Sequence, residues 1–415
     1  MRTTLGMTMA GTWACVALAC ATPAASADGP RSRQRVQTHA NTPASAPKAN
    51  DATQTPRGAT PGANALTDGT GKIYLNFING PAEALERQLA LDSPLITGRV
   101  VLFTEPNLGF YPKLWKGRWV HGGTPVEAHL PTHLAQVRRD VERLIPDPDW
   151  DGFAVIDYET WRPLWHLGVA DVVKDRVRNI VQARNPGVSG ARLEPLAAAA
   201  WDEAAMRFMN ETIDLCKELR PNATWGFFGW PKIGTGKKVD DLDAWIESQR
   251  VLLEHADAIY PEVYARRIST NRDNGTREYA PRGAVKNHLK RMILWSRRFA
   301  GDRPVLAYAS LRYNSDYEAV KSQPLSQEDL ETMIRTPLEA GADGVILWAA
   351  TGTAGNADFI LRQTRDRVVP LAERLLGADS TSIIGSGDGS TNAPTGSAGA
   401  PNEPNSSRRR RAAGG

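Results

Sequence analysis

The stretch that decides the fold is "DGFAVIDYETWRPLW", residues 151–165, in which an apolar run leads directly into two acids. The run "GFAVID" (152–157) is short and continuously apolar, as expected for a parallel strand covered on both faces. Six further runs of this kind follow the chain: "KIYLNFI" (72–78), "RVVLFT" (99–104), "TWGFFG" (224–229), "AIYPEVY" (258–264), "PVLAYASL" (304–311) and "GVILWAA" (344–350). Helical patterns lie between them, so the sequence predicts an α/β fold, a distorted TIM-like (β/α) barrel with about seven parallel strands.

A doubly wound open sheet is the alternative α/β architecture. Such sheets often bind nucleotides through a glycine-rich turn after the first strand. No GxGxxG motif follows residues 72–78, and "GTGKK" (234–238) lacks the spacing and the Ser or Thr of a phosphate loop. We therefore expect the barrel, with its chemistry at the carboxyl ends of the strands.

Composition divides the 415 residues into four segments. We expect a signal peptide (1–27), a disordered linker (28–71), a catalytic barrel (72–377) and a disordered basic tail (378–415). The apolar run of the first segment is shorter than the ~20 residues of a spanning helix, so we expect no membrane span. Cleavage near Ala27 predicts a secreted or periplasmic protein, with a lipoprotein anchor at Cys20 as the alternative.

Cysteine is rare in this chain. Cys15 and Cys20 fall in the expected signal peptide, which leaves Cys216 alone in the mature protein. A single cysteine forms no internal disulfide, so the core alone must stabilise the fold. Cys216 shares a helical spacing with Ile213 and Leu219, which indicates a buried thiol rather than a nucleophile.

Basic residues concentrate between positions 265 and 303, where eleven Lys or Arg occur with three acids, although the net charge is only +4. This segment is either a solvated helix face or a surface that meets a polyanion. No metal-ligand spacing is evident. We expect a monomer with no cofactor, no metal and no nucleic-acid partner.

The two acids of the opening stretch share one face of their strand. Alternation points Val155, Asp157 and Glu159 into the barrel mouth, and Ile156 and Tyr158 toward the covering helices. Two acids in a confined site cannot both ionise cheaply, so one proton is held to higher pH. A carboxyl that keeps its proton can protonate the leaving oxygen of a glycosidic bond.

Aromatic and basic neighbours leave two interpretations of this pair. Trp161 and Trp165 offer flat faces for sugar rings, which favours the enzyme. Alternatively, Asp157 or Glu159 forms a structural ion pair with Arg162.

No second carboxylate is evident at another strand end, although retaining glycosidases usually place one about 5 Å from the first. Its apparent absence favours a substrate-assisted scheme, in which the 2-acetamido oxygen of the sugar attacks the anomeric carbon. Asp157 then orients the acetamido group, and Glu159 acts first as acid and then as base.

The stretch "GFAVIDYETWRPLW" resembles the signature AVIDWExWRPxW of the hyaluronidases, glycoside hydrolase family 56. Further elements are similar in the same order: "NLGFYPKL" to LGxYPYY, "HGGTP" to xGGxPQ, "ELRPNATWGFFGWP" to LRPxxLWGFYxFP, "AIYPEVY" to LYPSIY, "RPVLAYASLRYN" to LPVxPYxxIxYD and "GADGVILWAATG" to GxxGVVLWxSWEN. The resemblance covers about residues 72–370 and is to a divergent, bacterial-type member. The family's distorted barrel of seven strands agrees with the strand count.

The resemblance implies that Glu159 is the proton donor and Asp157 its partner. It also implies that Tyr111, Tyr264 and Trp348 line sugar subsites and that Arg162 braces the acidic pair. The implied function is endo-acting, retaining cleavage of β-linked N-acetylhexosamine bonds. The implied substrate is an acidic, glycosaminoglycan-like polysaccharide such as hyaluronan or chondroitin, which suits the basic segment.

Three positions depart from the family pattern. Phe228 replaces a tyrosine near the acetamido group, Asn314 replaces an aspartate, and Thr351 replaces a tryptophan. Loss of a transition-state donor can cost on the order of 10²-fold in rate. These changes keep open an alternative, a catalytically impaired polysaccharide-binding module on the same barrel. A chitinase-like barrel is disfavoured because the run of spaced aspartates before its D-x-E pair is missing.

Overall fold

The computed structural model describes residues 71–232, 244–265, 268–270, 277–279, 282–314, 322–352 and 354–376. The expected signal peptide, nearly all of the linker and the basic tail lie outside these residues. Within the described part of the chain, no helix is both long and apolar enough to cross a bilayer.

Parallel ladders join the strands into two groups, in the orders β10-β11-β1-β2 and β3-β6-β7. Their bounds are β1 (Lys72–Ile78), β2 (Leu95–Ile96), β3 (Val100–Thr104), β6 (Phe153–Asp157), β7 (Thr224–Phe227), β10 (Leu306–Ser310) and β11 (Gly344–Ala350). Six of the seven predicted apolar runs therefore contain strands of these ladders.

The seventh run, residues 258–264, connects the two groups without forming a continuous ladder. It makes isolated parallel bridges to both neighbours, Phe228↔Tyr260, Ile259↔Val305 and Glu262↔Tyr308. Pro261 has no N–H to donate, which interrupts the regular pattern in the middle of the run. Main-chain bonds persist on either side, since the N–H groups of Ile259 and Val263 donate to Pro304 and Tyr308.

The circle closes between β1 and β3, which lie side by side. Here Asn76 Nδ2 donates to the Val100 carbonyl oxygen over 3.4 Å. The result is the predicted distorted barrel rather than an open doubly wound sheet. The carboxyl ends of all these strands meet at one mouth.

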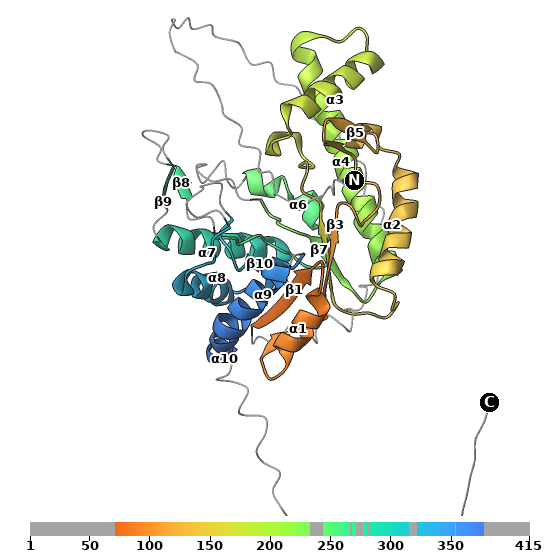
Figure 1. Ribbon diagram of the computed structural model, residues 1–415. Helices are drawn as coiled ribbons and strands as arrows, with labels where there is room; N and C mark the ends of the chain where they lie inside the picture. The colour runs from red at the N-terminus through yellow and green to blue at the C-terminus, as the bar shows by residue number, and fades with distance from the viewer. Residues whose placement is uncertain are drawn as a thin grey trace, which may run out of the picture.

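Helices cover the outside of the barrel and extend beyond it. They are α1 (Ala82–Ala90), α2 (Leu130–Leu144), α3 (Asp171–Arg184), α4 (Leu193–Leu219), α6 (Arg250–Leu253), α7 (Arg282–Ala300), α8 (Gln327–Glu339), α9 (Ala354–Gln363) and α10 (Val369–Leu376). A π-helical turn, Thr364–Val368, joins the last two. Figure 1 shows α2, α3 and α4 on one side of the strands and α7, α8, α9 and α10 on the other.

Two hydrophobic clusters separate the inside of the barrel from its helical coat. Val155 belongs to the inner cluster, whereas Ala154, Ile156 and Tyr158 belong to the outer one. This confirms the predicted alternation along β6.

The inner cluster is strongly aromatic. Tyr74 meets Phe153 edge to face with ring centroids 5.2 Å apart, and Phe228 meets Tyr308 in the same way at 5.1 Å. Gly226 makes room for this packing, because a Cβ there would lie 2.4 Å from the Ala258 carbonyl oxygen. The mouth therefore has a buried, aromatic floor.

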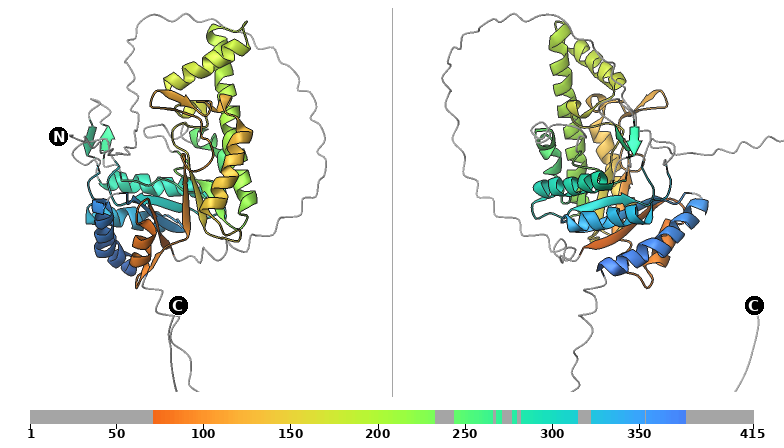
Figure 2. Two further views of the ribbon diagram at one scale, coloured as in Figure 1. Left: turned by 45° about the vertical axis from the view of Figure 1, so that its right-hand side comes forward. Right: turned by 90° about the vertical axis from the view of Figure 1, so that its left-hand side faces the viewer.

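A lobe stands above the mouth, built from insertions after β3 and β6. The first insertion contains a hairpin of β4 (Lys113–Trp115) and β5 (Arg118–Val120), followed by a 3-10 turn at Pro125–Glu127. The second contains α3, which packs against α4. In Figures 1 and 2 the hairpin lies beside α3 and α4, which extend past the strands.

Cys216 lies in α4 and is fully buried, as predicted. The structure describes only part of the basic segment 265–303, for which a solvated helix face or a polyanion-binding surface was expected. Arg266 and Arg267 lie outside the described residues. Arg297 and Arg303 bind backbone carbonyls at the amino ends of the strands, away from the mouth, so these two cations serve the fold.

Candidate active site

Strand β6 delivers two acids to the barrel mouth. Thr104 pairs with Asp157 at the ends of β3 and β6, so Asp157 stands at the rim. Its carboxyl is half-buried, and its Oδ1 is buried without a hydrogen-bond partner among the described residues. A buried acceptor without a partner is costly in a folded protein, so it marks a place where a ligand can donate.

Burial is the main influence on Asp157. It raises the pKa of the carboxyl well above its ordinary value, and the negative charges of Glu159, Glu105 and Glu262 raise it further. Lys232 opposes this shift by favouring the charged form. Asp157 therefore holds a proton to higher pH than an exposed aspartate would.

Glu159 reaches solvent at the mouth, two residues beyond Asp157. Surrounding protein atoms limit the hydration of its carboxyl and raise its pKa, while the charges of Lys232 and Arg162 partly lower that pKa. The two acids titrate as a coupled pair, so the pair keeps a proton to higher pH than either acid would in water.

Glu105 is a site residue that the sequence analysis missed. Its Oε1 accepts the backbone N–H groups of Glu159 at 2.9 Å and Thr160 at 2.6 Å. Its Oε2 accepts the Thr160 hydroxyl at 2.7 Å and the Lys113 ammonium at 2.5 Å. Glu105 thus fixes the backbone that carries the acid. The available signal was an acid directly after the strand run 99–104.

Glu262 is the second carboxylate that the sequence analysis overlooked. It lies in the run 258–264 and pairs with Lys232 at 3.9 Å. The expectation of no acid at another strand end was therefore wrong. Both added carboxylates are engaged, Glu105 by four donors and Glu262 by an ammonium, so neither is presented as a nucleophile.

Arg162 contacts the backbone beside the acid. Its Nη1 donates to the carbonyl oxygen of Glu159 at 2.9 Å. The alternative of a structural ion pair with either acid is not formed among the described residues. Arg162 braces the turn that presents Glu159, and its charge lowers the pKa of that carboxyl.

Three aromatic side chains predicted to line the site meet at the mouth. Tyr264 stacks against Trp348 at 6.4 Å between ring centroids, and Phe228 lies 6.0 Å from Tyr264. The charges of Asp157 and Glu159 raise the pKa of the Tyr264 hydroxyl, after a larger effect of burial. These rings and the two acids therefore form one site.

Trp348 offers a hydrogen-bond donor at the mouth, whereas Asn314 and Thr351 do not contact the acids in the described chain. The Trp348 Nε1 is buried without a partner among the described residues, as is the acceptor Asp157 Oδ1. Asn314 is exposed and its backbone N–H donates to Ala265, but no side-chain contact with the acids is present in the described chain. Thr351 instead binds the end of β1, through its hydroxyl, at the Ile78 carbonyl oxygen.

Three other aromatic residues predicted to meet sugar lie in the core. Tyr111 is 1% exposed and stacks on Trp161 with ring planes 9° apart. Trp161 and Trp165 are also buried and meet Trp201 of α4 edge to face. The predicted sugar platforms at these positions are corrected to packing contacts, because α4 covers the rings.

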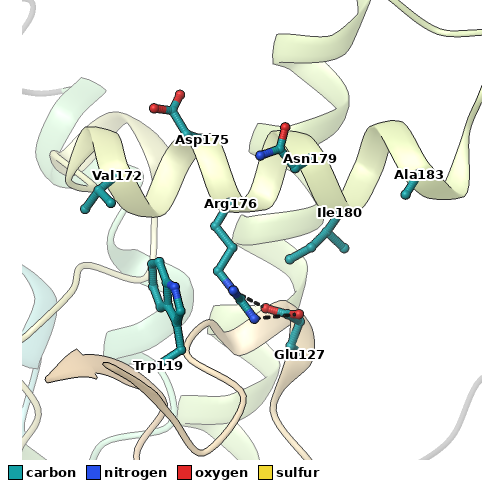
Figure 3. A pocket seen from close by; sticks show the side chains of 8 residues that line it. All are labelled: Trp119, Glu127, Val172, Asp175, Arg176, Asn179, Ile180 and Ala183. Atoms are coloured by element: carbon teal, nitrogen blue, oxygen red, sulfur yellow. Dashed lines mark hydrogen bonds and ion pairs between the residues drawn. The ribbon is translucent and has the colours of Figure 1, made fainter. Parts of the chain in front are cut away.

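A surface groove of about 490 Å³ lies outside this site, between the hairpin and α3. Its lining is Trp119, Glu127, Val172, Asp175, Arg176, Asn179, Ile180 and Ala183. Figure 3 shows the Arg176 side chain reaching from α3 to the Glu127 carboxylate beside the Trp119 ring. None of the residues predicted from the sequence lines this groove.

Metal ligands do not converge in the described chain, which holds no group of three or more His, Cys, Asp or Glu side chains suited to an ion. The chemistry available at the mouth is that of two coupled carboxyls, an ammonium and aromatic surfaces.

Comparisons with known sequences point to one family. A family model described as hyaluronidase matches residues 90–361. Hyaluronidase-1 and hyaluronidase-2 of Bitis arietans are each 30% identical over 280 residues, 63% of this chain and 60% of theirs. A hyaluronidase of Echis ocellatus is 27% identical over 340 residues, covering 75% of this chain and 73% of that protein. The chain thus spans about 60% of the length of the two Bitis relatives.

Solved structures share the fold. Bee venom hyaluronidase superposes with a TM-score of 0.61 at 21% identity, covering 73% of this chain and all of that one. A structure of bee venom hyaluronidase in complex with a hyaluronic acid tetramer gives a TM-score of 0.62 at the same identity, covering 74% and 99%.

Proposed function

Since the chain belongs to the hyaluronidase family, we propose that it is a glycoside hydrolase with Glu159 as its acid and base. The proposed substrate is an acidic polysaccharide with β-linked N-acetylhexosamine, of the hyaluronan or chondroitin type. We propose that its internal glycosidic bonds are cleaved. The observation that carries the proposal is the coupled pair at the end of β6. One carboxyl oxygen there has no partner in the described chain, and both carboxyls have raised pKa values.

The proposed reaction uses the substrate's own acetamido group. Its carbonyl oxygen attacks the anomeric carbon while the bond to the leaving oxygen breaks, and Glu159 gives its proton to that oxygen. The resulting carboxylate then removes a proton from water, which opens the cyclic intermediate and retains the configuration. Asp157 holds the acetamido N–H through its buried oxygen. The engagement of Glu105 and Glu262 supports this scheme, because neither of these two carboxylates is presented as a nucleophile.

Release of reducing ends from hyaluronan, chondroitin and chitin oligosaccharides tests the proposal. We expect release from at least one of the two acidic polymers. Products with even numbers of sugars would show that a single type of linkage is cut, and an early mixture of many sizes would show cleavage at internal bonds. The Glu159→Gln variant is the matched control, because it keeps the size of the side chain and one carbonyl oxygen but cannot donate the proton. Release that persists in this variant would contradict the assignment of Glu159.

The second candidate is a polysaccharide-binding module that has lost catalysis. Phe228 favours it, because this ring lies 7% exposed against Tyr264 and has no hydroxyl to offer an acetamido group. Binding of the same polymers without release of reducing ends would support the module. We further propose export through residues 1–27, and sequencing of the mature amino terminus after expression with its leader tests this.

A further inference from the structure

The β4–β5 hairpin has a tight turn that exposes its tip. Lys116 and Gly117 have φ values of +48° and +76°, the sign that a two-residue type I′ turn requires at both central positions. The ladder pairs Lys113 with Val120, Leu114 with Trp119 and Trp115 with Arg118. Alternation therefore places Lys113 and Trp115 on one face of the hairpin and Trp119 on the other.

The Trp119 face is already occupied by the lobe. The Arg176 guanidinium lies 4.6 Å from the Trp119 ring centroid and binds Glu127 through two bonds of 2.5 and 3.0 Å. Figure 3 shows this arrangement, with the tryptophan standing below α3. Cation–π and bidentate contacts of this kind fix the orientation of a side chain as well as its position. The hairpin is therefore anchored to α3.

The opposite face is tied to the candidate active site. Lys113 Nζ binds Glu105 Oε2 at 2.5 Å, and the other oxygen of Glu105 accepts the N–H of Glu159 at 2.9 Å. The same ammonium lies 5.0 Å from the Trp115 ring centroid. A short chain of contacts thus connects the Trp115 ring to the backbone of the acid.

Trp115 is the most exposed tryptophan among the large hydrophobic residues of the described surface, at 46%. Lys116, whose ammonium lies 5.7 Å from the ring centroid, and Arg118 are both exposed beside it. The mouth itself collects carboxylates, with Glu105 and Glu262 near the acidic pair. A polyanion entering this mouth meets repulsion, so cations beside the entrance favour its approach.

We propose that Trp115, Lys116 and Arg118 form a distal subsite for an acidic sugar of the polysaccharide. This inference rests on the proposed function and adds a binding position to it. The indole face takes the apolar face of a sugar ring, as flat aromatic groups at binding surfaces do. Lys116 and Arg118 then pair with the hexuronate carboxylate. Trp115 lies two residues beyond Lys113, about 7 Å along the strand, and Lys113 itself reaches the backbone of the acid only through Glu105, so the ring is a position distal to the acid.

The test compares how three variants of the protein bind hyaluronan of different lengths. Binding of hyaluronan tetrasaccharide, decasaccharide and polymer is measured by calorimetry in a Glu159→Gln background, which prevents cleavage. Trp115→Ala removes the platform, Trp115→Phe keeps a ring, and the double variant Lys116→Gln with Arg118→Gln removes the charges. Leu196→Ala changes an exposed apolar residue on α4 and is the matched control.

Trp115→Ala is expected to weaken decasaccharide and polymer binding about five- to tenfold and to leave the tetrasaccharide unchanged. Trp115→Phe should recover most of that loss. The charge variant should reduce the dependence of polymer affinity on salt concentration. Steady-state kinetics should show the same length dependence, as a higher KM for the polymer at an unchanged kcat.

Unchanged polymer binding in Trp115→Ala overturns the subsite, as does an equal loss for the tetrasaccharide and the polymer. Circular dichroism and thermal unfolding of each variant identify a folding defect, and the Phe variant then decides the outcome. Cleavage by the native protein with no effect at Trp115 contradicts only the subsite. Absence of cleavage contradicts the proposed function, while the binding series still reports on Trp115.

Discussion

The two ends of strand β6 carry the same residue type in opposite states. Asp151, before the strand, binds Arg99 at 2.7 Å, and this contact lowers the pKa of its carboxyl. Asp157, at the other end, has a buried oxygen without a partner in the described chain, and burial raises its pKa. Five residues thus separate an aspartate whose carboxyl is paired from one whose buried oxygen has no partner in the described chain.

Other strands repeat the contrast. At the amino ends, Asp257 pairs with Lys217 at 2.6 Å and Asp343 pairs with Arg297. At the mouth, Glu262 adds its charge to the acidic pair and raises the pKa of both carboxyls. One end of the barrel holds its charges in pairs that stabilise the fold. The other end concentrates like charges, which costs stability and is typical of a catalytic site.

The largest expected effect is on catalytic activity, when the acid at position 159 is replaced. Glu159→Gln should lower kcat on hyaluronan about 10²- to 10⁴-fold, because a positioned general acid contributes that much. Asp151→Asn is the matched control at the other end of the strand, with kcat unchanged. Reducing-end assays on both variants provide the comparison, and similar losses in the two would contradict it.

Asp157→Asn should separate activity from stability. Activity should fall on the order of 10²-fold, since the group that we propose to hold the acetamido is altered. Stability should rise near neutral pH. The pKa of Asp157 is raised in the folded state, so the unfolded chain ionises first and folding loses stability as pH rises from about 4. Urea unfolding at pH 4 and pH 7 measures this, and the gain should appear only at pH 7.

Lys232→Met should move the pH profile of catalysis. Lys232 lowers the pKa of Glu159, so its removal raises that pKa further. The acid form of Glu159 then persists to higher pH, and the basic limb of kcat/KM shifts upward. A limb that stays in place or moves to lower pH would remove Lys232 from the electrostatics of the pair.

The smallest expected effect concerns the paired end. Asp151→Asn should destabilise the protein by roughly 0.2–1 kcal/mol at pH 7, the usual range for a solvent-accessible ion pair. The pKa of Asp151 is lowered in the folded state, so its contribution is present above about pH 4 and is lost as pH falls through the folded pKa. Denaturant unfolding of the variant and the native protein should therefore converge at low pH.

The sequence predicted the barrel because its strands are continuous apolar runs with a readable alternation. Val155 and Ile156 face opposite clusters, as the period of two requires. The same rule aimed Asp157 and Glu159 at the mouth. Their raised pKa values followed from proximity and confinement, which short sequence separation already implies.

Other features depend on contacts between distant segments. Glu105 lies 54 residues from Glu159, and only the pairing of β3 with β6 brings them together. An aromatic side chain in a loop can bind sugar or pack in the hydrophobic core, and the outcome depends on whether a helix covers it. Trp161 was predicted at the surface, but Trp201 of α4 packs against it and the side chain is buried. Pro261, by contrast, was a local signal for the broken ladder of its strand.

The proton on Glu159 is the claim on which the proposed chemistry depends. A carbon-13 titration of glutamate carboxyls, compared between the native protein and Glu159→Gln, isolates the signal of this residue. We predict a midpoint above 4.5, the ordinary value for glutamate, because burial of the carboxyl disfavours its charged form. A midpoint at or below 4.5 in the native protein would contradict the account.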